Sequence, residues 1–312
     1  MRDRLFIFAF FALAALLLPP ALRGAAEGTR VPPGLPETFE ILLTETGEVR
    51  TVTPEEYLVG CLAAEIPIDY EQEALNAQAA ASYTYALRLA ANPENTPEGA
   101  LLSDDGKTHQ PFFTPEKCAE LYGESYAAYL PRLKEAAAYG VSHPITYEGE
   151  PIYAVYHSVS AGRTSSAYGI WGRELAYLAP AESAADRDYP YYECTNEMTV
   201  EAARLALVAA KSDIVTPADY GKWFSDFNIN EDGYVLSVRI GENLFSGGDI
   251  WRIFGLRSTA FTVEYRDGIF TFRTKGYGHG AGLSQYGANE LAKAGKTAEE
   301  ILTHYYTGVT VG

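Results

Sequence analysis

The order of apolar and polar positions predicts strands and helices that are interspersed along the chain, without a regular βαβ alternation. A small hairpin is expected first, because Phe39–Leu43 and Val49–Val52 flank the turn sequence Glu45-Thr46-Gly47. Further strands are expected at Ile145–Tyr147, Ile152–Ser158, Tyr234–Ile240, Phe261–Tyr265 and Ile269–Thr274. This mixture favours an α+β fold, in a single mixed α/β body.

Two successive helices carry the clearest start signals. The first should begin after Thr53, whose side chain can form a capping box with Glu56, and should end at about Glu65. The second should follow a start signal at Asp69 and cover the Ala-rich segment Glu71–Ala91. Other helices are expected at Pro131–Tyr139, Val200–Ala210, Ala288–Ala294 and Ala298–Tyr306. The segments expected to be mainly loop are 92–125 and 160–195. The fold should therefore contain an N-terminal helical pair, several hairpins and closing C-terminal helices.

Residues 1–26 have the pattern of an export element. Two arginines precede the uncharged apolar run Leu5–Leu18, which has the length of a signal-peptide core and is shorter than the roughly 20 residues that span a bilayer. Whether the element is a cleaved signal peptide or a retained membrane anchor stays open. Residues 27–36 contain several Pro and Gly and are expected to tether it to the body at 37–312. We expect this body to work outside the cytoplasm.

Composition narrows the classes of partner. Lys and Arg number 24 against 41 Asp and Glu, a net charge of −17, which disfavours nucleic acid and anionic lipid because both would repel the chain. Three cysteines are too few for a disulfide framework or a Cys-rich zinc site. Whether Cys118 and Cys194 form a disulfide stays open. We expect no cofactor.

Glu65 is the first candidate for catalysis. Leu58, Cys61, Leu62 and Glu65 follow the spacing of one helix face, so the carboxyl group ends an apolar stripe that should face the core. Burial disfavours the charged form and raises the pKa of a carboxyl group. A carboxyl group that stays protonated near neutral pH is what general-acid catalysis needs. The alternative is an ordinary glutamate at a helix end that turns outward to water.

Polar side chains interrupt the apolar face of the second helix. Gln78, Ser82 and Tyr85 share that face with Leu75 and Leu89. Gln78 and Tyr85 are candidates to meet the carboxyl group of the first helix or a ligand hydroxyl. The alternative is that both are polar groups hydrogen-bonded within the core.

Two histidines lie in segments rich in small residues. His157-Ser158 ends a predicted strand before a Gly/Ser loop, and His279 lies within the glycine-rich run 276–282. Glycine lets a ligand or another strand approach the backbone closely. A nucleophile pair of His157 with Ser158 is excluded, because neighbouring side chains of a strand point to opposite faces. Two histidines without Asp or Cys partners are a weak metal signature, so no metal is expected. The alternative to a functional role is that each histidine only stabilises the fold.

Several blocks of sequence together resemble one family. In chain order they are EYLVGCLAAEIP (56–67), EALNAQAAA (73–81), His157-Ser158 with Gly162 and Thr164, Trp171, Tyr177-Leu178, GYGHGAGLSQYGA (276–288), Ile301-Leu302 and His304-Tyr305-Tyr306. The blocks span about 37–312 and resemble the stage II sporulation protein D and amidase-enhancer family, SpoIID/LytB. The signal or anchor at the N-terminus of family members also matches residues 1–26.

The resemblance implies a peptidoglycan lytic transglycosylase with Glu65 as the catalytic acid. In that reaction one carboxyl group protonates the glycosidic oxygen between N-acetylmuramic acid and N-acetylglucosamine. It then takes the proton of the C6 hydroxyl that attacks C1, which yields a 1,6-anhydro sugar. Hydrolytic glycosidases usually need two carboxylates, and no second carboxylate block is evident. The other function that the resemblance implies is a non-catalytic wall-binding module that stimulates an N-acetylmuramoyl-L-alanine amidase.

The resemblance also implies substrate-binding residues, partners and location. The residues expected to bind the glycan are Gln78, Tyr83, Tyr85, His157, Ser158, His279, Gln285 and Tyr286. Family members often carry Lys and Arg where this chain has Asn76 and Tyr83, so two cations are missing from the second helix. The expected partners are peptidoglycan glycan strands, with other wall hydrolases or membrane-bound sporulation proteins. The protein is expected to be exported, and either membrane-anchored or secreted.

Overall fold

The computed structural model describes residues 36–91 and 99–312. The export element expected over residues 1–26 and the tether expected over 27–36, apart from Pro36, lie outside the described residues. Among the helices that the structure describes, none combines the length and the apolar character needed to cross a membrane.

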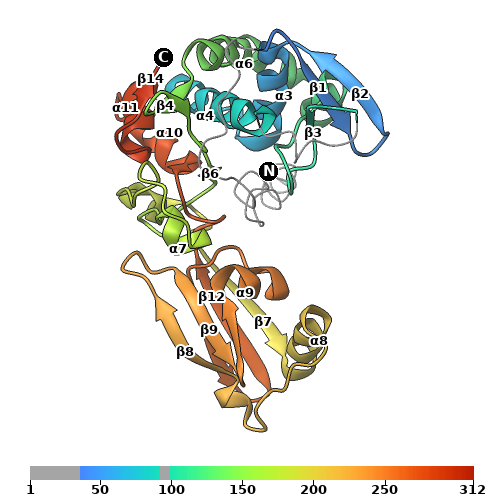
Figure 1. Ribbon diagram of the computed structural model, residues 1–312, viewed down its shortest axis with the longest axis vertical. Helices are drawn as coiled ribbons and strands as arrows, with labels where there is room; N and C mark the ends of the chain where they lie inside the picture. Colours follow the sequence, from blue (N-terminus) through green and yellow to red (C-terminus); the bar gives the residue numbers. More distant parts are fainter. Residues whose placement is uncertain (1–35, 92–98) are drawn as a thin grey trace. The chain divides into compact units, whose positions relative to one another are not determined.

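The chain forms two compact units. The first unit contains the residues up to Tyr156 together with Gly287–Gly312, and the second unit contains His157–Tyr286. Both contain helices and strands, which confirms the α+β class (Figure 1). The chain passes between the units inside two regular elements, β6 (Tyr156–His157) and α10 (Gln285–Lys293). No Pro- or Gly-rich linker therefore marks the boundary in the sequence.

A small sheet begins the first unit. β1 (Phe39–Leu43) pairs antiparallel with β2 (Glu48–Val52), and β3 (Leu102–Ser103) joins the other edge of β1 in parallel. The turn of the hairpin uses Gly47 at a φ of 74°, a conformation that glycine adopts without steric cost. The predicted hairpin is therefore confirmed. Alternate residues of β1, beginning with Phe39, are buried, so one face of this sheet covers the core.

The predicted helical pair is also confirmed. α3 (Pro54–Glu65) starts with the expected capping box: the Thr53 hydroxyl accepts the N–H of Glu56 at 3.2 Å, and the Glu56 carboxylate accepts the N–H of Thr53 at 2.8 Å. α4 (Gln72–Ala90) begins after Glu71, two residues beyond the expected start signal. Figure 1 shows the two helices side by side in the middle of the first unit.

α5 (Pro115–Tyr122) lies in the segment 92–125, and the prediction that this segment is mainly loop is wrong for this part. The start signals are those of α3, since Thr114 accepts the N–H of Lys117 at 3.2 Å and a proline occupies the first turn. Apolar periodicity does not reveal the helix, because Cys118 is its one buried residue.

α6 (Glu124–Ser142) is longer than the predicted helix, which began at Pro131. Proline favours the first turn of a helix, but Pro131 lies inside α6. The preceding turns are stabilised by packing, since Tyr126 lies against the core cluster of this unit. α6 also approaches α4 closely: a Cβ atom at Gly140 would lie 2.7 Å from the carbonyl carbon of Ala79. The many alanines of α4 permit this approach.

The first unit is completed by β4 (Ile145–Tyr147), β5 (Glu150–Pro151), β14 (Thr310–Val311) and α11 (Ala298–Tyr305). β4 pairs antiparallel with both β5 and β14, so the second predicted hairpin is confirmed. Its returning strand, β5, lies before the predicted strand Ile152–Ser158. Of that predicted strand only Tyr156–His157 is in a strand, so the prediction is wrong for residues 152–155. The closing helices α10 and α11 are confirmed.

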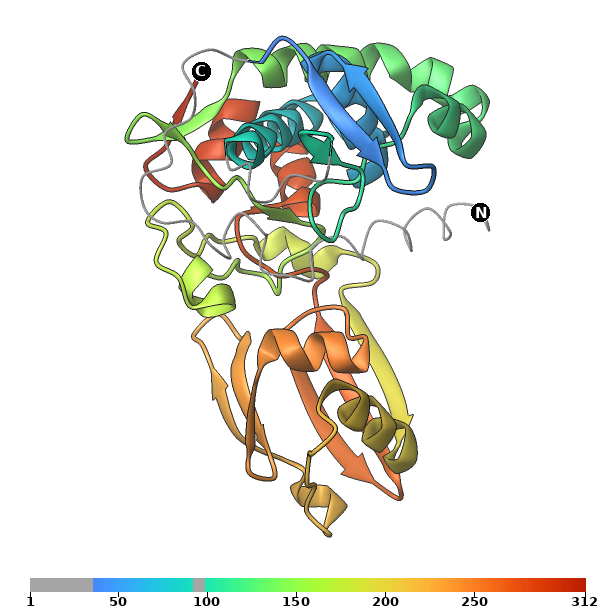
Figure 2. The ribbon, with the colours of Figure 1, turned by 45° about the vertical axis from the view of Figure 1, so that its right-hand side comes forward.

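The second unit contains two antiparallel three-stranded sheets (Figure 2). Their strand orders are β11 (Phe261–Arg266), β12 (Ile269–Lys275), β7 (Glu193–Thr199), and β10 (Asn243–Ser246), β9 (Val235–Ile240), β8 (Phe224–Ile229). The predicted strands at 234–240, 261–265 and 269–274 are confirmed. The sequence does not predict β8, because a register shift between Ser225 and Asn228 breaks its alternation.

Helices pack on these strands. α8 (Val200–Ala210) is confirmed as predicted, whereas α9 (Gly247–Phe254) was not predicted because it opens with two glycines. Its cap is nevertheless complete, since Ser246 and Asp249 bond each other's N–H groups at 3.0 and 3.1 Å. The short elements of this unit are α7 (Ala167–Trp171), η2 (Ala184–Asp188), η3 (Tyr220–Lys222) and β13 (Leu283–Ser284).

Candidate functional site

Glu65 is the last residue of α3, and its side chain is 7% exposed. The alternative in which this carboxyl group turns outward to water is therefore wrong. Burial raises the pKa of Glu65 to about 8, against a smaller lowering by a hydrogen bond from Tyr156. At neutral pH the group is thus mainly protonated, and it can give up a proton at little cost.

The carboxyl group is held by a chain of hydrogen bonds. The Tyr156 hydroxyl donates to Oε1 of Glu65 at 3.1 Å. The same phenol oxygen accepts from Nε2 of Gln110 at 2.8 Å, and Oε1 of Gln110 accepts from the Tyr57 hydroxyl at 3.0 Å. We call Tyr57, Gln110, Tyr156 and Glu65 the relay. All four residues belong to the first unit.

Sequence reasoning did not identify the other three members of the relay. Tyr57 lies four residues before Cys61 and eight before Glu65, and its aromatic ring is typical of a core position. Gln110 lies in the segment predicted to be mainly loop. Tyr156 directly precedes the candidate residue His157. No spacing rule connects the four positions, because the contacts join α3 to residues 53 and 91 positions distant in sequence.

Further neighbours of Glu65 include weakly acidic groups. Electrostatic interaction with Glu65 contributes to raising the pKa of Cys61 on α3 and of Tyr85 on α4, after the larger effect of burial. Ser82 bonds the phenol of Tyr156 and in turn accepts from Nε2 of Gln78 at 3.0 Å. Two of the predicted substrate-binding residues, Gln78 and Tyr85, therefore surround the relay from α4.

Tyr83 and Asn76 lie elsewhere on α4. Tyr83 is fully buried, and its ring centroid lies 6.4 Å from that of Phe39 on β1 in an edge-to-face arrangement. Its hydroxyl has no hydrogen-bond partner among the described residues. Asn76 accepts from Nε2 of Gln72 at 3.0 Å and donates to Glu73 at 3.4 Å. Neither position supplies a positive charge to the first unit.

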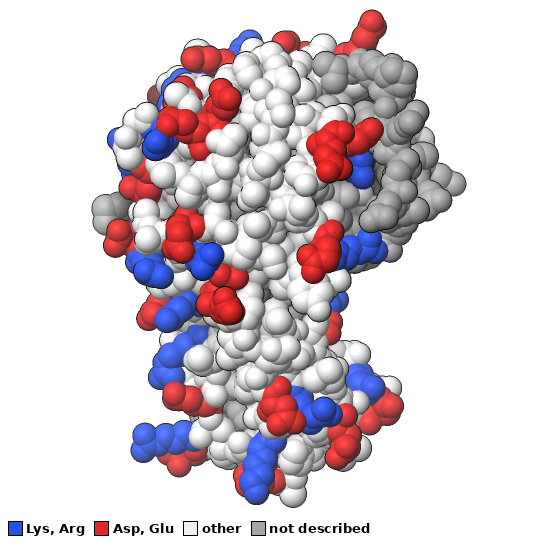
Figure 3. Space-filling model, turned by 60° about the vertical axis from the view of Figure 1, so that its left-hand side comes forward, with Lys and Arg blue, Asp and Glu red and all other residues white. Residues whose placement is uncertain are grey.

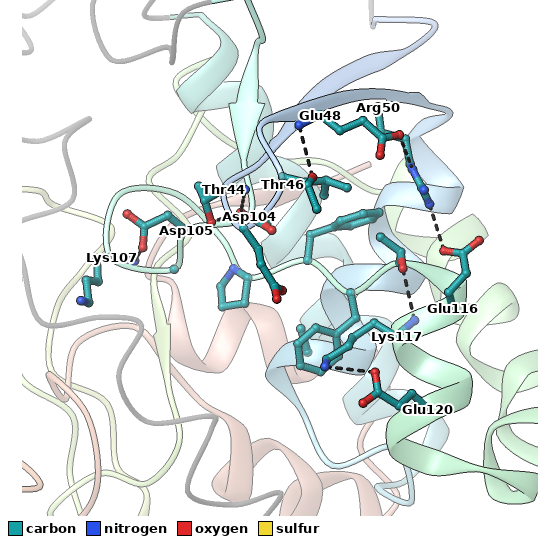
Figure 4. A pocket seen from close by; sticks show the side chains of 18 residues that line it. Thr44, Thr46, Glu48, Arg50, Asp104, Asp105, Lys107, Glu116, Lys117 and Glu120 are labelled. Atoms are coloured by element: carbon teal, nitrogen blue, oxygen red, sulfur yellow. Dashed lines mark hydrogen bonds and ion pairs between the residues drawn. The ribbon is translucent and has the colours of Figure 1, made fainter.

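A groove of about 900 Å³ lies elsewhere in the first unit, between the β1–β2 hairpin, the loop after β3 and α5 (Figure 4). Five of its charged side chains form ion pairs with one another, since Arg50 pairs with Glu48 and Glu116, and Lys117 pairs with Glu120. The residues that line it include no member of the relay. We assign it no chemical step.

The predicted site residues divide between the units. Glu65, Gln78, Tyr83 and Tyr85 lie in the first unit, and His157, Ser158, His279, Gln285 and Tyr286 lie in the second. Among the described residues, no group of three or more His, Cys, Asp or Glu could hold a metal ion. All three cysteines are free thiols, so Cys118 and Cys194 do not form a disulfide.

His157 and His279 lie together in the second unit, with ring centroids 5.6 Å apart and side chains 3% exposed. Nδ1 of His157 lies 3.1 Å from the carbonyl oxygen of Ala281, so this nitrogen carries the proton. Nδ1 of His279 accepts the N–H of Ala281 at 3.1 Å, so His279 is protonated on Nε2. Burial and then His279 lower the pKa of His157, which stays neutral. Its Nε2 has no partner among the described residues.

Backbone contacts brace the loops that carry these histidines. Val159 pairs with Tyr277, and Ser165 with Ala281. Gly278 has a φ of 109°, and a Cβ atom there would lie 2.8 Å from Cβ of His157. The close approach expected at the glycine-rich run is thus observed, and it is made by the other histidine loop.

A buried carboxyl group fixes the same loops. Asp186 accepts the N–H of Ser160 at 2.8 Å and the hydroxyl of Ser284 at 3.0 Å. Burial raises its pKa, and these hydrogen bonds oppose the rise. Sequence reasoning missed Asp186, which lies in a segment predicted to be mainly loop.

The other predicted residues of the second unit lie around the histidines. The carbonyl group of Ser158 accepts the N–H of Tyr286 at 3.0 Å. Gln285 is 4% exposed. The ring centroid of Trp171 lies 5.1 Å from that of His279, and Trp171 is partly exposed. The loops that carry the two histidines therefore present an aromatic side chain at the surface.

Charge of both signs lies on one face of the molecule. On the face shown in Figure 3, Lys and Arg side chains alternate with Asp and Glu side chains, and no broad basic field is visible. Such a surface offers no electrostatic footprint for a polyanion, in agreement with the net charge of −17.

Comparison with known proteins identifies the family that the sequence blocks resemble. A family model described as stage II sporulation protein, SpoIID, matches residues 43–147. Stage II sporulation protein D of Bacillus amyloliquefaciens is 33% identical over 88% of this chain and 79% of its own length. Stage II sporulation protein D of Bacillus subtilis is 31% identical over 92% of this chain and 82% of its own length. An amidase enhancer of Bacillus subtilis is 23% identical over 81% of this chain and 40% of its own length. The chain belongs to the stage II sporulation protein D family.

Proposed function

We propose that this protein is a lytic transglycosylase of peptidoglycan that cleaves the β-1,4 bond between N-acetylmuramic acid and N-acetylglucosamine. The observation that supports it most is the state of Glu65: a buried carboxyl group whose pKa is raised to about 8 and whose Oε1 is held by the Tyr156 hydroxyl. A general acid should have a pKa near the operating pH.

The proposed reaction uses one carboxyl group twice. Protonated Glu65 gives its proton to the glycosidic oxygen as the bond from C1 of the muramic residue to that oxygen breaks. The C6 hydroxyl of the same residue then attacks C1 and loses its proton to the Glu65 carboxylate. The products are a free 4-hydroxyl on N-acetylglucosamine and a 1,6-anhydro muramic terminus, and no water is consumed.

The surroundings of Glu65 suit this single-residue scheme. The groups described as interacting electrostatically with it are a thiol and phenols, Cys61, Tyr57, Tyr85 and Tyr156, all neutral at physiological pH. Retaining and inverting hydrolases instead place a second carboxyl group across the scissile bond. Burial keeps Glu65 protonated, and the Tyr156 hydroxyl stabilises the carboxylate once the proton has left.

We assign glycan binding to polar residues of both units. In the first unit Gln78, Tyr83 and Tyr85 are the proposed residues. In the second, Nε2 of His157 is an acceptor without a partner among the described residues, which suits a sugar hydroxyl or acetamido N–H. Ser158, His279, Gln285 and Tyr286 complete the proposed set.

The proposed setting is the cell wall during sporulation. We infer an exported protein, attached by its N-terminal segment or secreted, that acts on wall glycan strands in association with another wall hydrolase. The relative named amidase enhancer supports this association. It also favours the second candidate function, a wall-binding module that stimulates an amidase without cutting glycan itself.

Glu65→Gln separates the two functions. The amide keeps the shape of the carboxyl group but cannot give up a proton, so release of anhydro-muropeptides from purified glycan should fall by at least 1,000-fold, roughly the scale of lost general-acid catalysis. Glycan binding should remain. Glu55→Gln on the exposed first turn of the same helix is the matched control and should retain activity. Undiminished release by Glu65→Gln would favour the binding module.

A further inference from the structure

We propose that Gln110 is a positioning residue that forces the Tyr156 hydroxyl to point its hydrogen at Glu65. The inference rests on the proposed function for its meaning in catalysis, but its geometry stands on the relay alone. Gln110 is 1% exposed and lies on neither helix of the pair. Its amide bridges Tyr57 and Tyr156 at 3.0 and 2.8 Å.

The direction of the relay follows from counting donors. A phenol has one hydrogen to donate, whereas an amide offers an NH₂ donor and an oxygen acceptor at different ends. Oε1 of Gln110 accepts from the Tyr57 hydroxyl, which also bonds the Cys61 thiol, and Nε2 of the amide faces Tyr156. The Tyr156 oxygen is thereby an acceptor toward Gln110, and its single hydrogen is left for Oε1 of Glu65.

The opposite amide orientation would break the relay. With Oε1 of Gln110 toward Tyr156, the phenol would give its hydrogen to the amide. The hydroxyl oxygen of Tyr156 and Oε1 of ionised Glu65 would then face each other with no hydrogen between them. A buried charge without its hydrogen bond is costly, so Gln110 favours the carboxylate and opposes the effect of burial on the Glu65 pKa.

Ser82 acts in the same direction as Gln110, and the groups that face the carboxyl itself do not set this direction. On α3, Cys61 and Tyr57 face it, α4 contributes Tyr85, and β6 contributes Tyr156. Ser82 also bonds the Tyr156 phenol as a donor, which is the same direction as the bond from Gln110. These groups carry no charge at neutral pH, so they act on Glu65 through burial and hydrogen bonding.

Three variants test the inference in the full chain. Gln110→Leu removes the amide, and the Glu65 pKa should rise from about 8 by about half to one pH unit. Gln110→Glu should keep the relay while the new carboxyl group is protonated, because its O–H can replace the amide donor. Once that group ionises it accepts from both phenols, so Tyr156 turns away from Glu65. Tyr57→Phe frees the amide to rotate and should give part of the Leu effect.

The readout is the Glu65 pKa, followed through the ¹³C shift of its labelled carboxyl carbon, beside the pH profile of glycan cleavage. The matched control is Thr84→Val, which removes two buried hydrogen bonds on α4 at 2.7 and 2.8 Å outside the relay. It should lower stability and leave the Glu65 pKa unchanged. A Glu65 pKa in Gln110→Leu equal to that of the unmodified protein would overturn the inference, even if activity fell.

The carboxyl titration also separates this inference from the proposed function. If the protein cuts no glycan but the Glu65 pKa moves as expected, the relay stands and the enzyme proposal fails. If glycan is cut and the pKa does not move in any Gln110 variant, the enzyme proposal stands and Gln110 is only structural.

Discussion

The phenol of Tyr156 donates a hydrogen bond of 3.1 Å to Oε1 of Glu65, a carboxyl group that burial holds mainly in its neutral form at pH 7. The two residues are 91 positions apart in sequence and come from β6 and the end of α3. This contact stabilises the carboxylate, while burial stabilises the acid. The balance lets one side chain serve as acid and then as base.

Tyr156→Phe should upset this balance toward the acid. Loss of a hydrogen bond to a charged group costs about 1.5–3 kcal/mol, so the Glu65 pKa should rise by about one to two pH units. Because Glu65 then becomes a weaker acid, the first proton transfer, from the carboxyl group to the glycosidic oxygen, should be slower, and turnover should fall by about 10- to 100-fold. Steady-state kinetics on purified glycan from pH 5 to 10 would check both. Wild-type turnover with an unshifted pH profile would contradict the role of Tyr156.

The pH dependence of the unmodified protein follows from the same pKa. Free enzyme must carry the proton on Glu65, so kcat/KM should be level from about pH 6 to 7 and fall tenfold per pH unit above about 8. A profile that falls already above pH 5 would mean that Glu65 titrates like an exposed carboxyl group.

Stability should depend on pH in the opposite sense to that of a salt-bridged acid. The folded pKa of Glu65, about 8, lies above its ordinary value of 4.5, so the folded state binds the extra proton between these values. The stabilising effect is complete below about pH 4.5 and is lost as pH rises toward 8. Glu65→Gln removes this loss and should be more stable than the unmodified protein at pH 7, by on the order of 2–3 kcal/mol.

Thermal unfolding of the two proteins between pH 5 and 8.5 would check this. The difference in Tm should grow with pH. Equal melting temperatures across the range would show that the carboxyl group is not held neutral by burial. Glu55→Gln, on the exposed first turn of α3, should show no such trend.

Gly278→Ala tests the bracing of the histidine loops. The new methyl group would meet Cβ of His157 at 2.8 Å, and φ is 109°. Gly268→Ala is the control, because its φ is 88° but nothing lies within 4 Å of the added atom. The control should cost about 1 kcal/mol from backbone strain alone. Gly278→Ala should cost at least about 1 kcal/mol more and should shift the His157 ring resonances. An equal loss of unfolding free energy in the two variants would mean that the loops move apart without cost and do not brace each other.

Local signals predict much of the fold. The capping box at Thr53, the hairpin at Gly47 and α8 are where the sequence places them, because each depends on residues within a few positions. β8 and α6 depart from prediction because tertiary packing and a bulge override the local pattern. The division into two units is invisible because both crossings lie inside regular elements.

The candidate site is predicted only in part. Helix periodicity identifies the buried position of Glu65, and the glycine-rich run identifies the close approach to His157. Gln110, Tyr156 and Asp186 lie in segments with no pattern of their own. Their roles depend on contacts between distant segments, and no spacing along the chain encodes those contacts.

The most direct test of the account is to digest purified wall glycan in H₂¹⁸O and to analyse the muramic termini by mass spectrometry. Attack by the C6 hydroxyl predicts termini lighter by one water than reducing sugars, with no ¹⁸O incorporated, and their absence with Glu65→Gln. Termini that carry ¹⁸O would show hydrolysis by water and would contradict the single-carboxyl mechanism.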